Sequence, residues 1–326
     1  MKLSKNTDLS QPQSDPANHY PTPIEQQAYS TQSTKGAPPA DTPEREALLK
    51  GKGYFVVRGV LDEDDRRAIK DRLRRICEHI DHYRKYIELI KDVPDPALAQ
   101  HPDALLRHTW VNEIGFRDEV LWERCAAHPR LLDVAQKVLG STVYPLNGGG
   151  FFLKPPRSQS TVPWHQDASP FRVPPEAGES RNPLLFDYWL GVDEATIENG
   201  CLQLIPNSQK LGRLEHHDKG GVFPELHDPS EYGFKPDDIV SIPMEAGDML
   251  VWHQDMFHYS DPNRSEGQRI GKASVYMAGQ QEAELRNLIA QKMTGLGCNN
   301  QRPALCIDGE IQTLRPDAII PLPKGF

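Results

Sequence analysis

The C-terminal half of the chain, from residue 142 on, is a succession of short segments that suit β-strands. They are rich in β-branched and aromatic residues, and Gly or Pro interrupts them: STVYPLNGGGFFLKPP, PLLFDYWLGV, GCLQLIP, IVSIPMEAGDMLVWH and KASVYMAG. Many short strands with turn signals between them indicate an antiparallel sandwich or barrel, and not alternating βαβ units. The sequence therefore predicts a mainly β core with this architecture.

The N-terminal half predicts helices that flank this core. Thr42-Pro43 is a cap residue followed by proline, a combination that starts a helix. The run YFVVRGV (54–60) predicts a strand, and residues 61–90 predict one or two amphipathic helices with acids in the first turn. A further helical block is expected over 118–139, and Gly140 is its stop signal.

These patterns divide the chain into a tail and one domain. Residues 1–42 are rich in Gln, Ser, Pro and Thr, and such a segment cannot offset its ordering entropy by burial. We expect a disordered tail there and a single domain over 43–326. The expected parts of the domain are a helical part (43–140), a jelly-roll core (141–280), and a C-terminal helix and tail (281–326), with the helix itself over 282–297.

Composition narrows the possible partners. The formal net charge is −9 and the pI is near 5.7, which argues against nucleic acid or an anionic membrane surface. No apolar run approaches a membrane span, and the N-terminus lacks the apolar segment of a signal peptide. The five cysteines are scattered and form no CxxC pair, which suits a reducing compartment. We expect a soluble, cytoplasmic protein with a small-molecule partner. The sequence does not fix its oligomeric state.

The four letters WHQD occur twice, at 164–167 and 252–255. A histidine and an aspartate two residues apart face the same way on a strand, but about 200° apart on a helix. On a strand they can therefore share a metal ion. About one His-x-Asp match is expected by chance, and the chain has five. They are His79/Asp81, His101/Asp103, His165/Asp167, His216/Asp218 and His253/Asp255.

Position in the chain selects among the five. His79 lies inside a predicted helix, where the pair would diverge. Asp103 makes better sense as a helix cap, and His216 lies in a charged, Gly-flanked loop that is expected to be solvated surface. Only the two WHQD copies lie at strand-like apolar stretches.

An iron site of the facial type needs a second, remote histidine and leaves three coordination positions open. The first WHQD copy has one, because His258 follows Asp167 by 91 residues. The second copy has no histidine beyond His258, which follows Asp255 by only three residues. The predicted metal ligands and catalytic residues are therefore His165, Asp167 and His258. His253 is expected to orient or pack beside the site.

Further motifs follow one another in a fixed order. They are Lys154-Pro155-Pro156, PWHQD, Trp189 with ENGCLQLIPNSQK, Gly247-Asp248, and His258, Ser260, Asn263 and Arg269 in HYSDPNRSEGQR. Over about residues 52 to 280 this order resembles the phytanoyl-CoA dioxygenase family of iron(II)- and 2-oxoglutarate-dependent oxygenases. The resemblance implies a double-stranded β-helix, the cupin-like jelly roll, with flanking helices.

The resemblance also implies roles for single residues. It makes the ligands of Fe(II) His165, Asp167 and His258. Arg269 takes the place of the guanidinium that binds the distal carboxylate of 2-oxoglutarate, a bidentate, charge-assisted pair. Ser260, as a hydroxyl donor, and Trp189, as a wall of the pocket, fall at co-substrate positions. Arg264 lacks the family spacing and is expected on the surface.

Two positions bear on the chemistry that the resemblance implies. Gly150 stands where relatives have a side chain that contacts the co-substrate, so the backbone or another residue must replace that contact. Related halogenases have Gly or Ala in place of Asp167, which frees a site for chloride. The aspartate therefore predicts hydroxylation, desaturation or ring closure, with 2-oxoglutarate and O2 as co-substrates and succinate and CO2 as products.

The substrate is less constrained by the sequence. Long segments at 168–183 and 211–238 are expected to edge the pocket as lids or binding loops. Candidate substrate-binding residues are Phe152, Phe171, Arg172 and Gln203. An acyl-CoA needs a basic patch for its phosphates, and none is visible outside the helix at 66–92. We therefore favour a free small molecule of amino-acid-like or secondary metabolism. An acyl-CoA 2-hydroxylase and a non-catalytic jelly-roll binding protein are the alternatives.

Overall fold

Two antiparallel sheets form the framework of the protein. The structure, a computed structural model, describes residues 41–87, 89–146, 149–167, 184–217, 219, 224–279 and 303–326. The strands of the larger sheet are β1 (Tyr54–Val57), β2 (Ile90–Asp92), β3 (His108–Asn112), β4 (Val143–Pro145), β5 (Gly150–Lys154), β7 (Phe186–Gly191), β10 (Met249–Trp252), β12 (Arg269–Ala278), β13 (Cys306–Ile307) and β14 (Glu310–Ile311). Those of the smaller sheet are β6 (Val162–His165), β8 (Leu202–Leu204), β9 (Val240–Ile242) and β11 (His258–Ser260).

Strands that are distant in sequence lie next to each other in both sheets. The larger sheet runs β1-β10-β7-β12-β4-β13-β14, and β5 pairs with β12 and leads through β3 to β2. The smaller sheet runs β6-β11-β8-β9. All strand pairs in the described ranges are antiparallel. No βαβ unit occurs among these pairs, as the strand pattern predicts.

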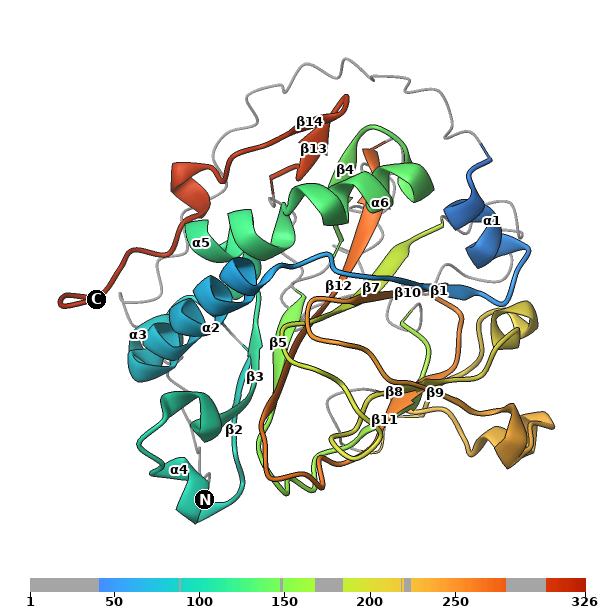
Figure 1. Cartoon of the computed structure of the whole chain (residues 1–326), viewed down its shortest axis with the longest axis horizontal. Helices are drawn as coiled ribbons and strands as arrows, with labels where there is room; N and C mark the ends of the chain where they lie inside the picture. The colour runs from blue at the N-terminus through green and yellow to red at the C-terminus, as the bar shows by residue number, and fades with distance from the viewer. Residues whose placement is uncertain are drawn as a thin grey trace, which may run out of the picture. The chain divides into compact units, whose positions relative to one another are not determined.

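Helices cover one face of the larger sheet. Figure 1 shows α2, α5 and α6 together along one side of β12, β7 and β10, and α6 contacts both β7 and β12. The helices are α1 (Pro43–Leu49), α2 (Glu63–Glu78), α3 (Ile80–Tyr83), α4 (Pro96–Ala99), α5 (Glu119–Leu121), the π-helix η4 (Trp122–Ala126) and α6 (Pro129–Leu139). The 3-10 helices are η2 (Ala104–Arg107), η3 (Ile114–Phe116), η8 (Ser208–Leu211), η9 (Pro229–Tyr232), η10 (Pro236–Asp238) and η12 (Pro316–Ala318).

The central strands of the larger sheet are buried on both faces. Successive side chains on a strand point to opposite sides, and here each side meets an apolar core. In β7, Tyr188 and Leu190 belong to the core under the helices, whereas Trp189 belongs to the core between the sheets. In β10, Val251 faces the helices and Leu250 faces the other way. The segments PLLFDYWLGV and GDMLVWH are therefore apolar almost without alternation.

The two sheets face each other. Leu202, Leu204 and Ile242 of the smaller sheet share one core with Trp189 and Leu250 of the larger sheet. Aligned antiparallel sheets bury their inner faces in this way. The predicted mainly β fold with flanking helices is confirmed, and the inner faces of the two sheets enclose the predicted site.

The dipeptide Gly247-Asp248, just before β10, fastens the segment that follows β1. Asp248 is buried, and its carboxylate accepts hydrogen bonds from Gly59 N at 2.9 Å and Glu245 N at 3.0 Å. Gly247 has a φ of +95°, and a Cβ there would lie 2.2 Å from the carbonyl oxygen of Leu61. Only glycine allows this close approach of the two backbones.

The helical elements begin and end at the predicted signals. Thr42 caps α1, and its hydroxyl accepts a hydrogen bond from Arg45 N at 3.2 Å. Asp103 caps η2 through a backbone N–H at 3.1 Å, and Gly140 ends α6. The stretch 61–90 contains two helices, α2 and α3, which is one of the two predicted forms, and ends at β2.

Three predictions fall wholly or mostly outside the described residues. They are the disordered tail, of which residues 1–40 are not described, the pocket-edging loop at 168–183, and the closing helix at 282–297. In the described part of the chain, no helix combines the length and the apolar character that crossing a bilayer requires.

Asp65 joins three helical elements, so its loss is expected to destabilise the fold. The carboxylate accepts from Asp62 N in the capping box of α2 (3.3 Å) and bonds Arg124 (3.1 Å) and His128 (3.2 Å). We expect Asp65→Ala to lower the free energy of unfolding, measured in urea, by about 2–4 kcal/mol, because a cap and buried partners are lost together. The control Asp64→Ala removes a side chain that is 75% exposed and should cost less than about 0.5 kcal/mol. Equal losses of unfolding free energy in the two variants would contradict the role assigned to Asp65.

Candidate active site

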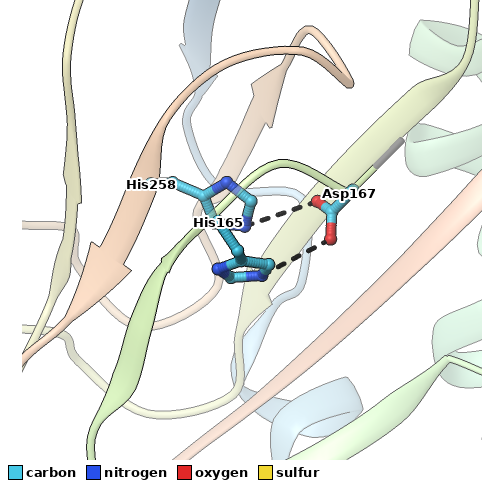
Figure 2. A group of neighbouring side chains, drawn as sticks. All are labelled: His165, Asp167 and His258. Carbon is cyan, nitrogen blue, oxygen red and sulfur yellow. Dashed lines mark ion pairs between the residues drawn. The ribbon is translucent and has the colours of Figure 1, made fainter. Parts of the chain in front are cut away.

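Three side chains from two neighbouring strands can share one metal ion. His165 is the last residue of β6, Asp167 follows it, and His258 opens β11 directly opposite His165. The two imidazole centroids lie 3.9 Å apart. Asp167 Oδ1 lies 3.7 Å from His165 Nε2, and its Oδ2 lies 3.4 Å from His258 Nε2 (Figure 2). One ligand atom from each residue lies within 4.8 Å of the other two.

Both imidazoles are held in the tautomer that ligates a metal through Nε2. His165 Nδ1 lies 2.8 Å from the carbonyl oxygen of Pro163, and His258 Nδ1 lies 3.1 Å from that of Met256. A carbonyl oxygen only accepts, so each Nδ1 carries the hydrogen and each Nε2 presents its lone pair. Burial, together with the neighbouring His258, lowers the pKa of His165 to about 3. The imidazole therefore stays neutral, the form that binds metal.

The second WHQD copy supports this site and does not form another one. Trp252 donates an indole N–H hydrogen bond of 3.1 Å to Asp167 Oδ2, and its ring lies 5.1 Å from that of His258. Within the described residues His253 is not part of the metal-binding group. Its Nδ1 accepts a hydrogen bond from Asp255 N at 3.1 Å, and burial lowers the pKa of His253 to about 4. The first copy of the repeat thus supplies two candidate ligands, and the second supplies a tryptophan that orients the carboxylate of one of them.

Gln166, between His165 and Asp167, connects the site to a loop that is distant in sequence. Its backbone N–H donates to His216 Nε2 at 2.9 Å. Its side chain donates to the Gly212 carbonyl and accepts from Leu214 N, both at 2.9 Å. His216 is buried, so the prediction that it is solvated surface is wrong. Its partner lies 50 residues away in the chain, and no local pattern marks the pair.

A further carboxyl group, that of Asp187 on β7, lies beside Asp167. Asp187 is fully buried. Burial, with the neighbouring Asp167 and Asp255, raises the pKa of Asp187 well above its usual range. The neutral form of this carboxyl group is therefore favoured, because a third charge in this apolar setting is unfavourable. Sequence reasoning missed Asp187, since a lone acid in an apolar strand belongs to no motif.

A buried guanidinium lies on the same inner face of the larger sheet. Arg269 opens β12, and its Cζ lies 5.0 Å from the centroid of the Trp189 ring, a cation–π contact. Gly271 makes room for this ring, because a Cβ at that position would lie 2.0 Å from it. Burial lowers the pKa of Arg269 to about 10, so the side chain remains charged at neutral pH.

The carbonyl of Gly200, in the NGCL turn, joins two of the predicted co-substrate residues. Arg269 Nη1 donates to this oxygen, and Ser260 Oγ donates to it at 2.9 Å. Arg269 Nε is buried and has no hydrogen-bond partner in the described structure. Gly200 has a φ of +79°, and a Cβ there would lie 2.2 Å from the Asp261 carbonyl oxygen. The turn therefore depends on glycine, and the guanidinium keeps donor capacity for an anion.

Asn263 holds the turn that leads into Arg269. The side chain is fully buried and donates to three carbonyl oxygens, those of Lys154 (3.1 Å), Pro155 (3.0 Å) and Gly267 (2.7 Å). This network explains why an asparagine stands between the metal ligand and the arginine, and why it does so next to the KPP segment.

Aromatic residues of β5 and β3 lie beside Gly271 on the larger sheet. Phe152 on β5 lies opposite Gly271 and stacks on Trp110 of β3, with ring centroids 5.0 Å apart. Trp110 also occupies the space of a side chain at Gly150, where a Cβ would lie 1.8 Å from the indole nitrogen. A residue of β3 thus fills the position that the glycine leaves vacant.

Not all the expected substrate-binding residues are found near the His-Asp-His group. Gln203 lies opposite Tyr259, and therefore on the other face of the smaller sheet from His258. Its side chain donates to Asp261 Oδ2 at 2.5 Å. The structure thus places Gln203 away from the metal group. Phe171 and Arg172 lie outside the described residues.

Residues 49–271 match the sequence profile described as phytanoyl-CoA dioxygenase (PhyH), and this range contains the His-Asp-His group and Arg269. The chain belongs to the phytanoyl-CoA dioxygenase family. A relative from Mus musculus, "Phytanoyl-CoA dioxygenase, peroxisomal", is 28% identical over 237 residues, covering 70% of this chain and 66% of that protein. Another, the 1-deoxypentalenic acid 11-beta-hydroxylase of Streptomyces arenae, is 27% identical over 240 residues, covering 68% and 76%. The chain thus spans about two thirds to three quarters of these relatives.

A solved structure confirms the fold class of this family member. The epimerase SnoN, in complex with Fe3+, alpha ketoglutarate and nogalamycin RO, aligns with a TM-score of 0.52 at 21% identity, covering 84% of this chain and 95% of that one. Membership of the phytanoyl-CoA dioxygenase family confirms the predicted enzyme class, a 2-oxoglutarate-dependent dioxygenase with iron as its metal.

The indole of Trp252 orients Asp167, so its removal is expected to weaken metal binding. Trp252→Phe keeps the ring but loses the N–H donor. We expect the affinity for Fe(II), titrated without oxygen, to fall about tenfold, which is typical for the loss of a partner behind a ligand. Trp164→Phe is the control, because that ring stacks on Tyr259 at 5.2 Å and bonds no ligand. Unchanged affinity in Trp252→Phe would show that the hydrogen bond does not position the carboxylate.

Proposed function

We propose that this protein hydroxylates a free small molecule, using Fe(II) and 2-oxoglutarate. In this proposal the metal is held by His165, Asp167 and His258, and the distal carboxylate of 2-oxoglutarate binds Arg269 beside Ser260 and Trp189. One observation carries it: a His-Asp-His group lies near a buried arginine that has no carboxylate partner among the described residues. The proposal includes one catalytic domain over 43–326 and a cytoplasmic location.

The donor set suits Fe(II). Two imidazole nitrogens and one carboxylate bind an ion from one side, which leaves open positions for a bidentate co-substrate and O2. Each ligand has the outer partner that such sites need: Pro163 and Met256 carbonyls for the imidazoles, and the Trp252 indole for the carboxylate. These partners fix the ring orientation before the metal arrives.

The residues near Arg269 suit a dicarboxylate. Arginine pairs with a carboxylate through two parallel hydrogen bonds, and these are stronger in a buried setting. The Trp189 ring covers one face of the guanidinium and keeps water away from it. Binding of a carboxylate would give the unpartnered Nε an acceptor.

The chemistry divides between the metal and the chain. Bound iron supplies the oxygen chemistry, in which 2-oxoglutarate becomes succinate and CO2 and the second oxygen atom enters a substrate C–H bond. The chain orients the ligands, binds the co-substrate and keeps the inner faces of the sheets dry. Because Asp167 is retained, no coordination position is left for a halide, which supports hydroxylation, or desaturation or ring closure, over halogenation.

A free small molecule is a better substrate than an acyl-CoA. The described cations of the long loop have carboxylates beside them: Arg213 Nε lies 3.9 Å from Asp255 Oδ1, and Lys219 Nζ lies 3.2 Å from Glu225 Oε2. They are less available to the phosphates of coenzyme A, which need unpaired donors. The Streptomyces relative is named for a free acid, which supports this choice. The mouse relative is named for an acyl-CoA, so a 2-hydroxylase of that type is the second candidate.

The first test of the function is spectroscopic. Adding 2-oxoglutarate to the Fe(II)-loaded protein without oxygen should produce a visible charge-transfer band. Asp167→Ala should weaken or abolish the band, and Arg269→Ala should weaken 2-oxoglutarate binding at least about tenfold, because a buried charge pair is lost. Arg264→Ala is the matched control, since that side chain is 61% exposed and lies 3.5 Å from Asp261. A folded, Fe(II)-binding protein that gives no band would contradict the proposal.

The second test separates the two substrate classes. Succinate release is measured with a panel of free acids and amines, and with the coenzyme A thioesters of the same acids. We expect the free molecules to stimulate succinate release about tenfold or more over the thioesters. A substrate that does not fit the pocket lacks the contacts that stabilise the transition state. Stimulation by thioesters alone would establish the acyl-CoA 2-hydroxylase instead.

A further inference from the structure

A second buried cation lies beside Arg269. Lys154 ends β5, and the antiparallel register places it directly opposite Arg269, at the start of β12. Residues that lie opposite each other in such a pair project from the same face of the sheet. Lys154 is 3% exposed and Arg269 is 2% exposed, so two basic side chains share one inner face away from solvent.

The two cations are connected only through neutral groups. Lys154 Nζ donates to Ser260 Oγ at 2.7 Å and also contacts the carbonyl oxygens of Ser260 and Asp261. Ser260 Oγ donates in turn to the Gly200 carbonyl, which also accepts from Arg269. Among the described residues, no carboxylate forms an ion pair with either cation. Buried charges are normally paired, so Arg269, and Lys154 whenever it is protonated, lacks a counter-ion in the described part of the chain.

The electrostatic consequence is visible on the lysine. Burial, and next the positive charge of Arg269, lower the pKa of Lys154 to about 6. Asp261, after β11, and Cys201, before β8, act in the opposite direction but do not compensate. An anion between the two cations would remove the repulsion and favour the charged lysine.

We propose that Lys154 is a second anchor for the distal carboxylate of 2-oxoglutarate, which lies between its ammonium group and the Arg269 guanidinium. This inference rests on the proposed function and adds a residue to its co-substrate site. It also assigns a role to the lysine of the KPP segment. In the competing explanation, Lys154 only ties the turn at Ser260 and Asp261 and never meets the co-substrate.

The test compares two 2-oxo acids that differ in one group. 2-Oxopentanoate has the carbon chain of 2-oxoglutarate but no distal carboxylate, and both bind Fe(II) through the same keto-acid end. Each is titrated without oxygen into the Fe(II)-loaded protein, and the charge-transfer band gives the dissociation constant. We expect Lys154→Met to weaken 2-oxoglutarate binding about 10- to 100-fold, as the loss of a buried charge-assisted bond does. Binding of 2-oxopentanoate should change less than about twofold.

Lys272→Met is the matched control. Lys272 is equally buried and lies on β12, the strand that pairs with β5, but its Nζ donates to Tyr188 OH in the core under the helices. This variant should leave both dissociation constants unchanged. Equal weakening of both acids in Lys154→Met would overturn the proposal in favour of the structural role, and so would unchanged binding of 2-oxoglutarate. If the wild-type protein gives no band with either acid, the proposed function fails and not this inference alone.

A measurement without substitution keeps the proposal testable if Lys154→Met does not fold. Above its pKa of about 6 the unliganded lysine is mostly neutral, so binding the carboxylate at pH 8 must take up a proton. Affinity for 2-oxoglutarate should therefore fall as the pH rises from 6 to 8, by about tenfold for each unit at most. Groups at the metal affect both acids alike, so the ratio of the two affinities isolates the distal end. A constant ratio over this range would overturn the proposal.

Discussion

The site depends above all on antiparallel register between strands that are distant in sequence. His165 and His258 lie side by side because β6 and β11 pair at that position. Lys154 and Arg269 share a face because β5 and β12 pair at theirs. A slip of one residue in either pair would turn one partner to the opposite face. The layers that hold the register, helices on one side and the smaller sheet on the other, are therefore needed to bring the residues of the candidate site together.

The inner faces carry two kinds of polar group with opposite electrostatic character. At the metal end burial keeps His165 neutral, and burial together with Asp167, the one carboxylate that would ligate, raises the pKa of Asp187. At the other end Arg269 keeps its charge with Lys154 beside it and no counter-ion in the described structure. The arrangement suits a ligand with a chelating end and an anionic end, which is the chemical outline of a 2-oxo dicarboxylate.

The fold class could be predicted from the sequence, and so could the proximity of His165, Asp167 and His258. Residues two apart face the same way on a strand, and His258 lies remote in sequence from the other two. Contacts between residues distant in sequence could not be predicted, because strand register and loop packing depend on the whole fold. That is why His216 appeared solvated, why the Trp252 indole had no predicted role, and why Gln203 was assigned to a pocket that it does not face. Caps such as Thr42 and Asp103 were predictable, since their partners lie within a few residues.

The carbonyl of Gly200 has a consequence for how the protein matures. In the described structure this peptide oxygen accepts hydrogen bonds from both Arg269 and Ser260. A buried guanidinium with no acceptor at all would oppose folding until a small molecule arrived. Because the chain supplies this acceptor itself, its core can close around the arginine without a bound ligand. Under the proposed function, folding then does not have to wait for the supply of a metabolite.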